Sequence, residues 1–234
     1  MRRRRFASAV IVAAGASLRM GQNKAFMELA GEPVILRTLR AFEASPVISE
    51  IIAVCREEDM ERVAQLASES GITKLAHVVI GGASRPLSVY NGLQAVSKKA
   101  DIIAIHDGAR PLVTNEIIRD AVHKAEKYHA AAPAVAVKAT VKEADNGVVL
   151  RTPPRERLFE AQTPQCFDAD LIRAALVSAI RKKLAITDDC AAVEVLGCTV
   201  YLTEGSYENI KITTPEDLAV AEAIIARRTE VPAE

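Results

Sequence analysis

A run of small residues followed by two cations, near the N-terminus, has the composition of a phosphate-binding loop. Ala13-Ala14-Gly15 ends a continuous apolar run, and Arg19 and Lys24 come shortly after it. Small side chains let backbone N–H groups approach a ligand closely, and nearby cations attract phosphate oxygens. The segment matches neither the Walker A pattern nor the glycine fingerprint of dinucleotide-binding folds, so an ordinary strand-to-helix loop is the alternative.

Histidine and cysteine are not spaced for nucleophilic or zinc chemistry. None of the four histidines has a persuasive triad setting, and no C-x-x-C pair occurs among the four cysteines, Cys55, Cys166, Cys190 and Cys198. We therefore expect reduced thiols in a cytosolic protein.

Other short motifs follow in order along the chain. They are Gly81-Gly82 with Arg85 and Ser88-Val89, His106-Asp107-Gly108-Ala109-Arg110-Pro111, residues 137–142, Gln162-Thr163-Pro164-Gln165, Thr187-Asp188-Asp189, and Glu204-Gly205-Ser206 with residues 209–213. With the first loop, which continues as Arg19-Met20-Gly21, they resemble the 2-C-methyl-D-erythritol 4-phosphate cytidylyltransferase family. Each motif is weak alone, but the ordered set covers nearly the whole chain and is specific.

The resemblance implies an enzyme that converts CTP and methylerythritol phosphate to the cytidine diphosphate alcohol and pyrophosphate, with Mg²⁺ as cofactor. The nucleophile would be a phosphate monoester oxygen, which is largely deprotonated at pH 7 and needs no protein nucleophile. The protein must then align two polyanions and stabilise charge on the α-phosphate and the leaving pyrophosphate. A cytidylyltransferase acting on ribitol 5-phosphate, or a non-catalytic nucleotide-binding module, is the alternative.

Motif matches assign individual roles under this resemblance. The catalytic residues are Arg19, Lys24 and Lys211; the nucleotide-binding residues are Ala13, Ala14, Gly15, Gly82 and Ser88; the substrate-binding residues are Asp107, Arg110, Thr140, Arg155, Thr187 and Thr213. For the cations the alternative is solvated surface charge, and for the Asp-Arg pair it is a salt bridge within a loop.

Four positions depart from the family pattern. Asn23 stands where a proline usually precedes the lysine, and Ala25 replaces a common glutamine. Ala83 replaces a frequent acidic residue after the glycine pair, and Ala139 an aspartate before the arm threonine. None of the four removes a charged catalytic position, so the departures bear on nucleotide affinity.

The elements that must position these residues alternate along the chain, which predicts an α/β fold. Strands are predicted at residues 9–13, 51–54, 77–80, 102–105, 134–137 and 199–203, and helices at 34–43, 58–70, 88–97, 114–128, 169–183, 188–196 and 215–227. Thr114, Thr187 and Thr214 are the predicted helix caps. We expect one Rossmann-like domain over residues 1–234, with a mainly parallel sheet flanked by helices.

A projecting β-arm at about residues 138–158 interrupts this alternation. Residues 141–151 read as two strands around Asn146-Gly147, a type I′ hairpin signal, and they are too charged for a core hairpin. The resemblance implies that the arm crosses to a second subunit, where Thr140 and Arg155 reach the bound methylerythritol phosphate. It therefore implies a homodimer with composite active sites.

Overall composition excludes several other classes of protein. Thirty basic and thirty acidic residues give the 234-residue chain a net charge of zero, which disfavours nucleic-acid binding through a broad basic surface. No apolar run reaches the roughly 20 residues of a membrane span. Arg2 to Arg5 and the apolar residues 6–16 imitate a targeting signal, but a buried first strand is favoured, and we expect a cytoplasmic protein.

Overall fold

The computed structural model describes residues 5–15 and 23–230, in which strands and helices alternate as the sequence predicts. The strands are β1 (Ala7–Val12), β2 (Glu28–Leu29), β3 (Glu32–Pro33), β4 (Glu50–Cys55), β5 (Leu75–Ile80), β6 (Ile102–Asp107), β7 (Ala130–Ala136), β8 (Glu143–Asp145), β9 (Val148–Arg151), β10 (Phe159–Ala161), β11 (Gln165–Asp168) and β12 (Tyr201–Glu204). The helices are α1 (Val34–Ala44), α2 (Met60–Glu69), α3 (Arg85–Ala95), α4 (Asn115–Tyr128), α5 (Ala169–Arg181), α6 (Asp189–Val195) and α7 (Pro215–Glu230), with 3₁₀ turns η2 (Lys24–Phe26), η3 (Glu57–Asp59) and η4 (Arg155–Arg157).

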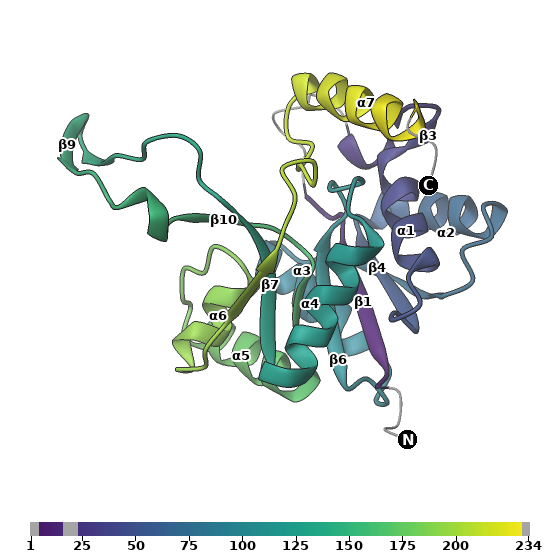
Figure 1. Cartoon of the computed structure of the whole chain (residues 1–234). Coiled ribbons are helices and arrows are strands. Elements are labelled where there is room, and N and C mark those ends of the chain that lie inside the picture. The colour runs from purple at the N-terminus through teal and green to yellow at the C-terminus, as the bar shows by residue number, and fades with distance from the viewer. Residues whose placement is uncertain (1–4, 16–22, 231–234) are drawn as a thin grey trace.

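The main sheet runs in the order β10-β7-β11-β6-β1-β4-β5, with β12 beside β7 (Figure 1). Strands β6, β1, β4 and β5 pair in parallel, whereas β11 pairs antiparallel with both of its neighbours. The apolar stretch near the N-terminus is β1, a central strand, which confirms its interpretation as a buried strand. The prediction of a mainly parallel, Rossmann-like sheet is confirmed in this central part.

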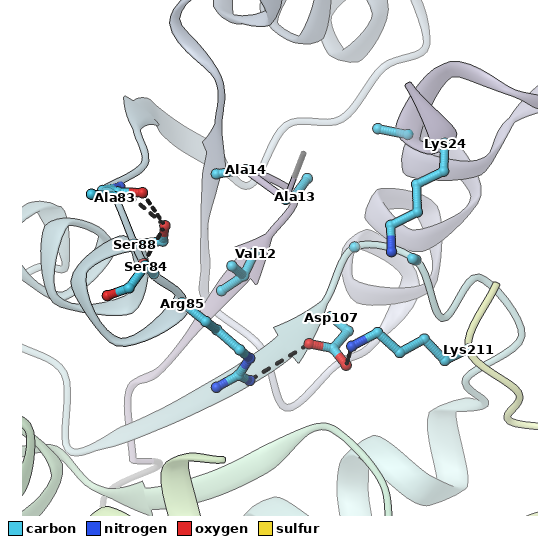
Figure 2. A pocket seen from close by; sticks show the side chains of 15 residues that line it. Val12, Ala13, Ala14, Lys24, Ala83, Ser84, Arg85, Ser88, Asp107 and Lys211 are labelled. Atoms are coloured by element: carbon cyan, nitrogen blue, oxygen red, sulfur yellow. Dashed lines mark hydrogen bonds and ion pairs between the residues drawn. The ribbon is translucent and has the colours of Figure 1, made fainter. Parts of the chain in front are cut away.

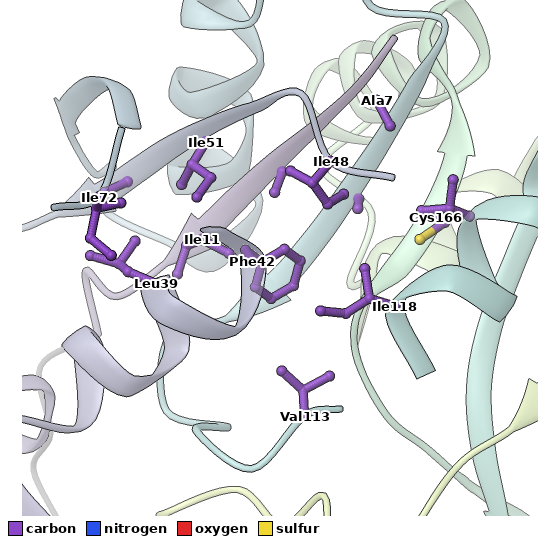
Figure 3. Packing of buried hydrophobic residues seen from close by; sticks show 14 of the residues in the cluster. Ala7, Ile11, Leu39, Phe42, Ile48, Ile51, Ile72, Val113, Ile118 and Cys166 are labelled. Atoms are coloured by element: carbon purple, nitrogen blue, oxygen red, sulfur yellow. The ribbon is translucent and has the colours of Figure 1, made fainter. Parts of the chain in front are cut away.

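Helices cover both faces of the sheet. Alternate residues of a strand point to opposite faces, so Ile11 and Ile51 pack under α1, α2 and α4, and Val10 and Ile52 pack under α3, α5 and α6. Figure 3 shows the first layer, with Phe42 of α1 lying against the sheet. Two apolar faces explain why these strands read as continuous apolar runs.

The C-terminal helix α7 packs outside these layers. Ala221 of α7 joins a small cluster with Leu29 of β2 and Ile212, and Figure 1 shows α7 lying beside β3 at one end of the sheet. Asp217 fixes the start of the helix, because its Oδ2 accepts hydrogen bonds from the backbone N–H groups of Thr213 and Thr214. This packing holds the segment before α7 against the sheet edge.

The predicted starts of two helices are wrong, by three residues at α3 and by one residue at α6. Helix α3 begins at Arg85 and not at residue 88, because Ser84 caps it by accepting a hydrogen bond from the N–H of Leu87. Helix α6 is capped by Asp188 and not by Thr187, since the Asp188 carboxylate accepts from the N–H of Ala191 at 2.9 Å. The predicted Thr114 cap of α4 is confirmed.

The predicted hairpin around Asn146-Gly147 is confirmed. Strands β8 and β9 pair antiparallel, and both turn residues have the positive φ angles of a type I′ turn, 46° at Asn146 and 80° at Gly147. Figure 1 shows this segment reaching far from the main sheet, with its side chains exposed. The four cysteines stand as free thiols.

Among residues 5–15 and 23–230, no helix has the length and apolar character needed to span a membrane.

Candidate active site

Three loops meet at the carboxyl ends of the parallel strands. The Ala13 N–H donates to the Val54 carbonyl at 2.7 Å, and the Gly108 N–H donates to the Val12 carbonyl at 2.8 Å. In the sheet, β4 and β5 lie on one side of β1, and β6 lies on its other side. The direction of the strand order therefore reverses between β1 and β6, and the loops after these two strands flank a topological switch point. Ligands of open α/β sheets bind in the crevice at such a point.

The glycine pair brings a third loop against the first. A Cβ on Gly81 would lie 2.3 Å from the Ala14 Cβ, and a Cβ on Gly82 would lie 2.4 Å from the Leu87 Cβ. Both distances are far shorter than real Cβ contacts, so Gly81 allows the β5–α3 loop to approach the β1 loop, and Gly82 allows the same loop to fold against the first turn of α3. The Ser88 hydroxyl holds this loop by accepting from the Gly82 N–H at 3.0 Å.

These loops enclose a cavity of about 440 Å³, within the range of small-ligand sites. It is lined by Val12, Ala13, Ala14, Gly15, Lys24, Ala25, Gly82, Ala83, Ser84, Arg85, Ser88, Asp107, Gly108, Ala109 and Lys211. Figure 2 shows Arg85 and Lys211 meeting Asp107 from different directions, and Lys24 pointing into the same space. The wall is therefore small and apolar at the β1 loop, and its charged side chains are Lys24, Arg85, Asp107 and Lys211.

Asp107, the last residue of β6, is surrounded by cations. Its carboxylate lies 2.8 Å from Lys211 Nζ, 3.5 Å from an Arg85 nitrogen and 3.6 Å from Arg110 Nε. Burial alone would raise the pKa of Asp107, but Lys211, Arg85 and Arg110 outweigh it and hold the pKa well below the usual range. Asp107 is ionised, and the cations around it exceed it in charge.

Arg85 links two buried carboxylates. One of its terminal nitrogens lies 2.8 Å from Asp189 Oδ2 as well as facing Asp107. Burial would lower the pKa of this guanidinium, but Asp189 and Asp107 raise it above its ordinary value. Burial raises the pKa of Asp189, against the opposing effect of Arg85. The ion pair fixes the direction in which Arg85 enters the cavity.

A buried histidine supports the turn that carries Asp107 and Arg110. The Thr163 hydroxyl accepts from the Asp107 N–H at 3.1 Å and lies 3.0 Å from His106 Nδ1. His106 Nε2 lies 3.1 Å from the Arg110 carbonyl oxygen, which only accepts, so Nε2 carries the proton and Nδ1 accepts from Thr163. Burial lowers the pKa of His106 to about 4, which keeps the ring neutral.

Lys211 reaches the cavity from the segment between β12 and α7. The Asn209 side chain donates to the carbonyl of Thr163 at 3.1 Å, and the Ile212 N–H donates to the Ala109 carbonyl at 2.8 Å. The Asn209 carbonyl in turn accepts from Arg110 at 2.8 Å. These bonds fasten the Lys211 segment to the β6 turn on both sides of the lysine.

The structure brings together most of the predicted nucleotide-binding and catalytic residues, and fewer of the predicted substrate-binding ones. Eight of them line the cavity: Ala13, Ala14, Gly15, Lys24, Gly82, Ser88, Asp107 and Lys211. Arg110 lies behind Asp107, and Arg19 lies outside the described residues. Thr187 is exposed and Thr213 gives its hydroxyl hydrogen to Asp217, so neither lines the cavity. Thr140 and Arg155 lie on the projecting arm.

Two residues of the site had no role assigned from the sequence. Arg85 belongs to the Gly81-Gly82 motif and Asp189 to the Thr187-Asp188-Asp189 motif, which are the signals that mark them. Their pairing joins residues 104 positions apart, so no local pattern reveals it. The role of the buried His106 was not predicted from the sequence either, because its ring bonds join the β10–β11 loop to the β6 turn.

The described residues contain no cluster of three or more histidines, cysteines or carboxylates suited to a metal ion. Asp107 is the carboxylate among the described cavity-lining residues, and it already faces three cations. Mg²⁺ is commonly held by one or two carboxylates together with substrate phosphates. A magnesium ion at this site would therefore take most of its protein-independent ligands from substrate phosphates, because the described lining supplies one carboxylate.

A nucleotidyltransferase of the α/β type is the class that this sheet and cavity indicate, because small-residue loops and cations meet in the crevice where ligands of open α/β sheets bind. Residues 7–227 match the family model described as 2-C-methyl-D-erythritol 4-phosphate cytidylyltransferase. The chain belongs to this family.

Relatives and solved structures agree with that assignment. Proteins named 2-C-methyl-D-erythritol 4-phosphate cytidylyltransferase from Pelotomaculum thermopropionicum and Halalkalibacterium halodurans are 48% and 44% identical to the chain; each alignment covers 94% of the chain, with 94% and 97% of the respective relative. The crystal structure of 4-diphosphocytidyl-2C-methyl-D-erythritol synthase from Anaerococcus prevotii is similar with a TM-score of 0.85 and 33% identity, over 95% of the chain and 96% of that structure. The likeness extends over the whole fold.

Proposed function

We propose that the protein transfers the cytidylyl group of CTP to 2-C-methyl-D-erythritol 4-phosphate, releasing pyrophosphate. The single observation that carries the proposal is the cavity at the switch point, which is lined by Lys24, Arg85 and Lys211 together with a loop of small residues. Family membership names the polyol phosphate, and the cations explain how such a reaction is promoted. The product would be 4-diphosphocytidyl-2-C-methyl-D-erythritol, an intermediate of non-mevalonate isoprenoid synthesis.

Charge stabilisation is the main catalytic device in this proposal. The substrate's phosphate oxygen attacks the α-phosphate, and negative charge develops on the pyrophosphate that leaves. Lys24 and Lys211 neutralise this charge from the cavity wall, and Arg19 is expected to join them from the β1–η2 connection. A well-placed donor of this kind is worth roughly 3 to 4 kcal/mol in the transition state.

The small-residue loops would bind the nucleotide. The backbone N–H groups at Ala13, Ala14 and Gly15 are assigned to the triphosphate, and the loop of Gly82 and Ser88 to cytosine and ribose. The Ser88 hydroxyl accepts from the Gly82 N–H and lies within hydrogen-bond distance of the Ser84 carbonyl, so these bonds tie the loop to the first turn of α3. Preorganised donors of this kind do not have to be ordered when the ligand binds.

The polyol phosphate would bind on the Asp107 side of the cavity. Asp107 is ionised and would accept hydrogen bonds from the hydroxyl groups of the polyol, and Arg110 pairs with the same carboxylate. Thr213 is assigned to the same substrate; its hydroxyl donates to Asp217, and it lies two residues after Lys211 in the chain. Thr187 is exposed at the start of α6 and would contact the substrate from the rim.

Mg²⁺ would be bound by the nucleotide's phosphates beside Asp107, and when bound it supplies further neutralisation of phosphate charge. The chain's own residues still perform the positioning. Lys24 and Lys211 approach the leaving group, and Arg85 is held at the cavity wall by Asp189.

A homodimer completes the proposal. Thr140 and Arg155 lie on the arm, away from the cavity of their own chain, so they serve a site only if the arm meets a second copy. The arm also exposes the apolar side chains of β9. In the dimer these two residues would bind the polyol phosphate in the partner's cavity, in a cytoplasmic enzyme.

The experiment measures pyrophosphate release from CTP with methylerythritol phosphate and with ribitol 5-phosphate, each with and without Mg²⁺. We expect release with methylerythritol phosphate and a requirement for Mg²⁺. Turnover with ribitol 5-phosphate alone would assign the enzyme to that polyol instead. No turnover with either would support a non-catalytic nucleotide-binding module.

A further inference from the structure

Asn23 begins the short turn that presents Lys24 to the cavity. Its Oδ1 accepts a hydrogen bond from the Ala25 N–H at 3.2 Å, and its carbonyl accepts from the Phe26 N–H at 3.1 Å. The side chain is therefore the N-cap of η2, the turn whose first residue is Lys24. The position of the lysine backbone depends on these bonds.

The other end of the same amide reaches a different element. Asn23 Nδ2 donates to Asp59 Oδ2 at 2.7 Å, and Asp59 lies in η3, immediately before α2. The Asp59 side chain is only 10% exposed, and Arg56 Nε donates to the same oxygen at 2.9 Å. One carboxylate thus receives both an amide and a guanidinium.

A second contact joins the same two segments. The Arg62 guanidinium of α2 lies over the ring of Phe26, 4.1 Å from the ring centre. Arg56 directly follows Cys55, the last residue of β4, so its end of the bridge is anchored to the central sheet. The turn that carries Lys24 is therefore tied to the β4–α2 connection by one polar contact and to α2 itself by one cation–π contact.

We infer that Asn23, through its bridge to Asp59, is a positioning residue that holds Lys24 at the leaving-group side of the cavity. The inference rests on the proposed function, because that function gives Lys24 its role. The Asn23–Asp59 bridge also explains how the chain keeps this turn in place with asparagine where the family pattern has proline. A cation misplaced by about 1 Å can lose a hundredfold in rate, so the bridge affects turnover more than binding.

Replacing the Asn23 amide by a carboxylate removes the bond to Asp59 while it retains the bond from the Ala25 N–H that caps η2. Asn23→Asp keeps the size of the side chain and the oxygen that accepts from Ala25, but it places a negative charge against Asp59. We expect kcat to fall about tenfold or more, with the KM for CTP changed far less. The matched control is Gln65→Glu, which makes the same exchange in an exposed amide–carboxylate pair with Glu69 on α2 and leaves kcat unchanged.

Exchanging the amide and the carboxylate between positions 23 and 59 should restore the lost kcat. In the double variant Asn23→Asp with Asp59→Asn, the amide introduced at position 59 donates to the carboxylate introduced at position 23, and most of the lost kcat should return. In the Lys24→Ala background Asn23→Asp should cause no further loss, because Asn23 acts through that lysine. Wild-type kcat in Asn23→Asp, no recovery in the folded double variant, or a further loss in the Lys24→Ala background would each overturn the inference.

A readout without turnover keeps the two proposals distinguishable. The rate at which acetic anhydride modifies the Lys24 amine, followed by mass spectrometry, is expected to change in Asn23→Asp, to return in the double variant, and to stay at the wild-type value in Gln65→Glu. If the wild type releases no pyrophosphate, the proposed function fails, while these rates still decide the bridge. Equal modification rates in all four proteins would overturn the bridge whatever the activity.

Discussion

At the scale of single residues, uncharged groups beneath the cavity hold its charges in place. Asp107 and Arg110 belong to one turn, and His106 touches both ends of it, through Thr163 at one end and the Arg110 carbonyl at the other. The ring has to be neutral to accept from Thr163 while it donates to the carbonyl. Protonation of His106 would turn Nδ1 from an acceptor into a donor, and its bond from the buried Thr163 hydroxyl would be lost.

This buried histidine predicts a loss of stability in mild acid. The pKa of His106 is about 4 in the folded protein and about 6.5 when unfolded, so between these values the unfolded state binds more protons. The free energy of unfolding should therefore fall as the pH drops from about 6.5 toward 4, by about 2 to 3 kcal/mol in total. Asp107 does not contribute in this window, because its depressed pKa makes its effect appear only below the ordinary aspartate pKa.

Urea unfolding at pH 7 and pH 4.5 measures the effect. His106→Asn retains hydrogen-bonding groups but no titrating ring, so this variant should lose less stability than the wild type between the two pH values. The two proteins should have the same pH dependence above pH 7. An equal decrease in both between pH 7 and pH 4.5 would refute the assignment to His106.

At the scale of elements, the arm is the part that the single chain does not explain. A two-stranded hairpin alone is marginally stable in water, and β9 leaves Val148 66% and Leu150 61% exposed. These residues are two positions apart, so they lie on one face of the strand. In the proposed homodimer, a second copy of the chain would cover this apolar face.

The dimer is tested by placing charge on that face. In the variant Val148→Glu with Leu150→Glu, light scattering should report a shift from dimer toward monomer, while circular dichroism stays unchanged. Activity should fall with the dimer, because Thr140 and Arg155 then no longer reach a partner's cavity. Val195→Glu, at a residue of α6 that is 52% exposed, is the matched control and should remain dimeric. A monomeric wild type, or a double variant that stays dimeric, would contradict the proposed arm interface.

At the scale of the whole molecule, charge is balanced in total and unbalanced locally. The chain has a net charge of zero, yet Lys24, Arg85 and Lys211 line one cavity with Asp107. The low-dielectric walls of a cleft concentrate such a local field. A neutral protein can therefore bind polyanions at one place without a basic surface.

The affinity for a phosphate ligand should depend on salt concentration if the cavity cations bind it. Raising NaCl from 0.05 to 0.5 M screens charges beyond a few ångströms, so the dissociation constant of pyrophosphate should rise about tenfold in calorimetry. Cytidine, which carries no phosphate, is the matched ligand, and its affinity should change little. A salt effect of the same size on both ligands would argue against phosphate binding by these cations.

The sequence by itself determined the features that depend on local geometry. Apolar runs located β1 and β4, the Thr114 cap located α4, and Asn146-Gly147 located the hairpin, because each reflects side-chain periodicity or allowed φ and ψ angles over a few residues. Motif order gave the family, and with it most of the residues that line the cavity.

Only the tertiary structure decided which distant groups pair. Strands β10 and β11 are short, and their positions are set by pairing with β7 and β6, so no periodic pattern in the sequence predicts them. The Arg85–Asp189 pair and the Asn23–Asp59 bridge join residues 104 and 36 positions apart. Their partners are set by how the loops converge at the sheet edge, and electrostatic and hydrogen-bond energies depend on distances in space.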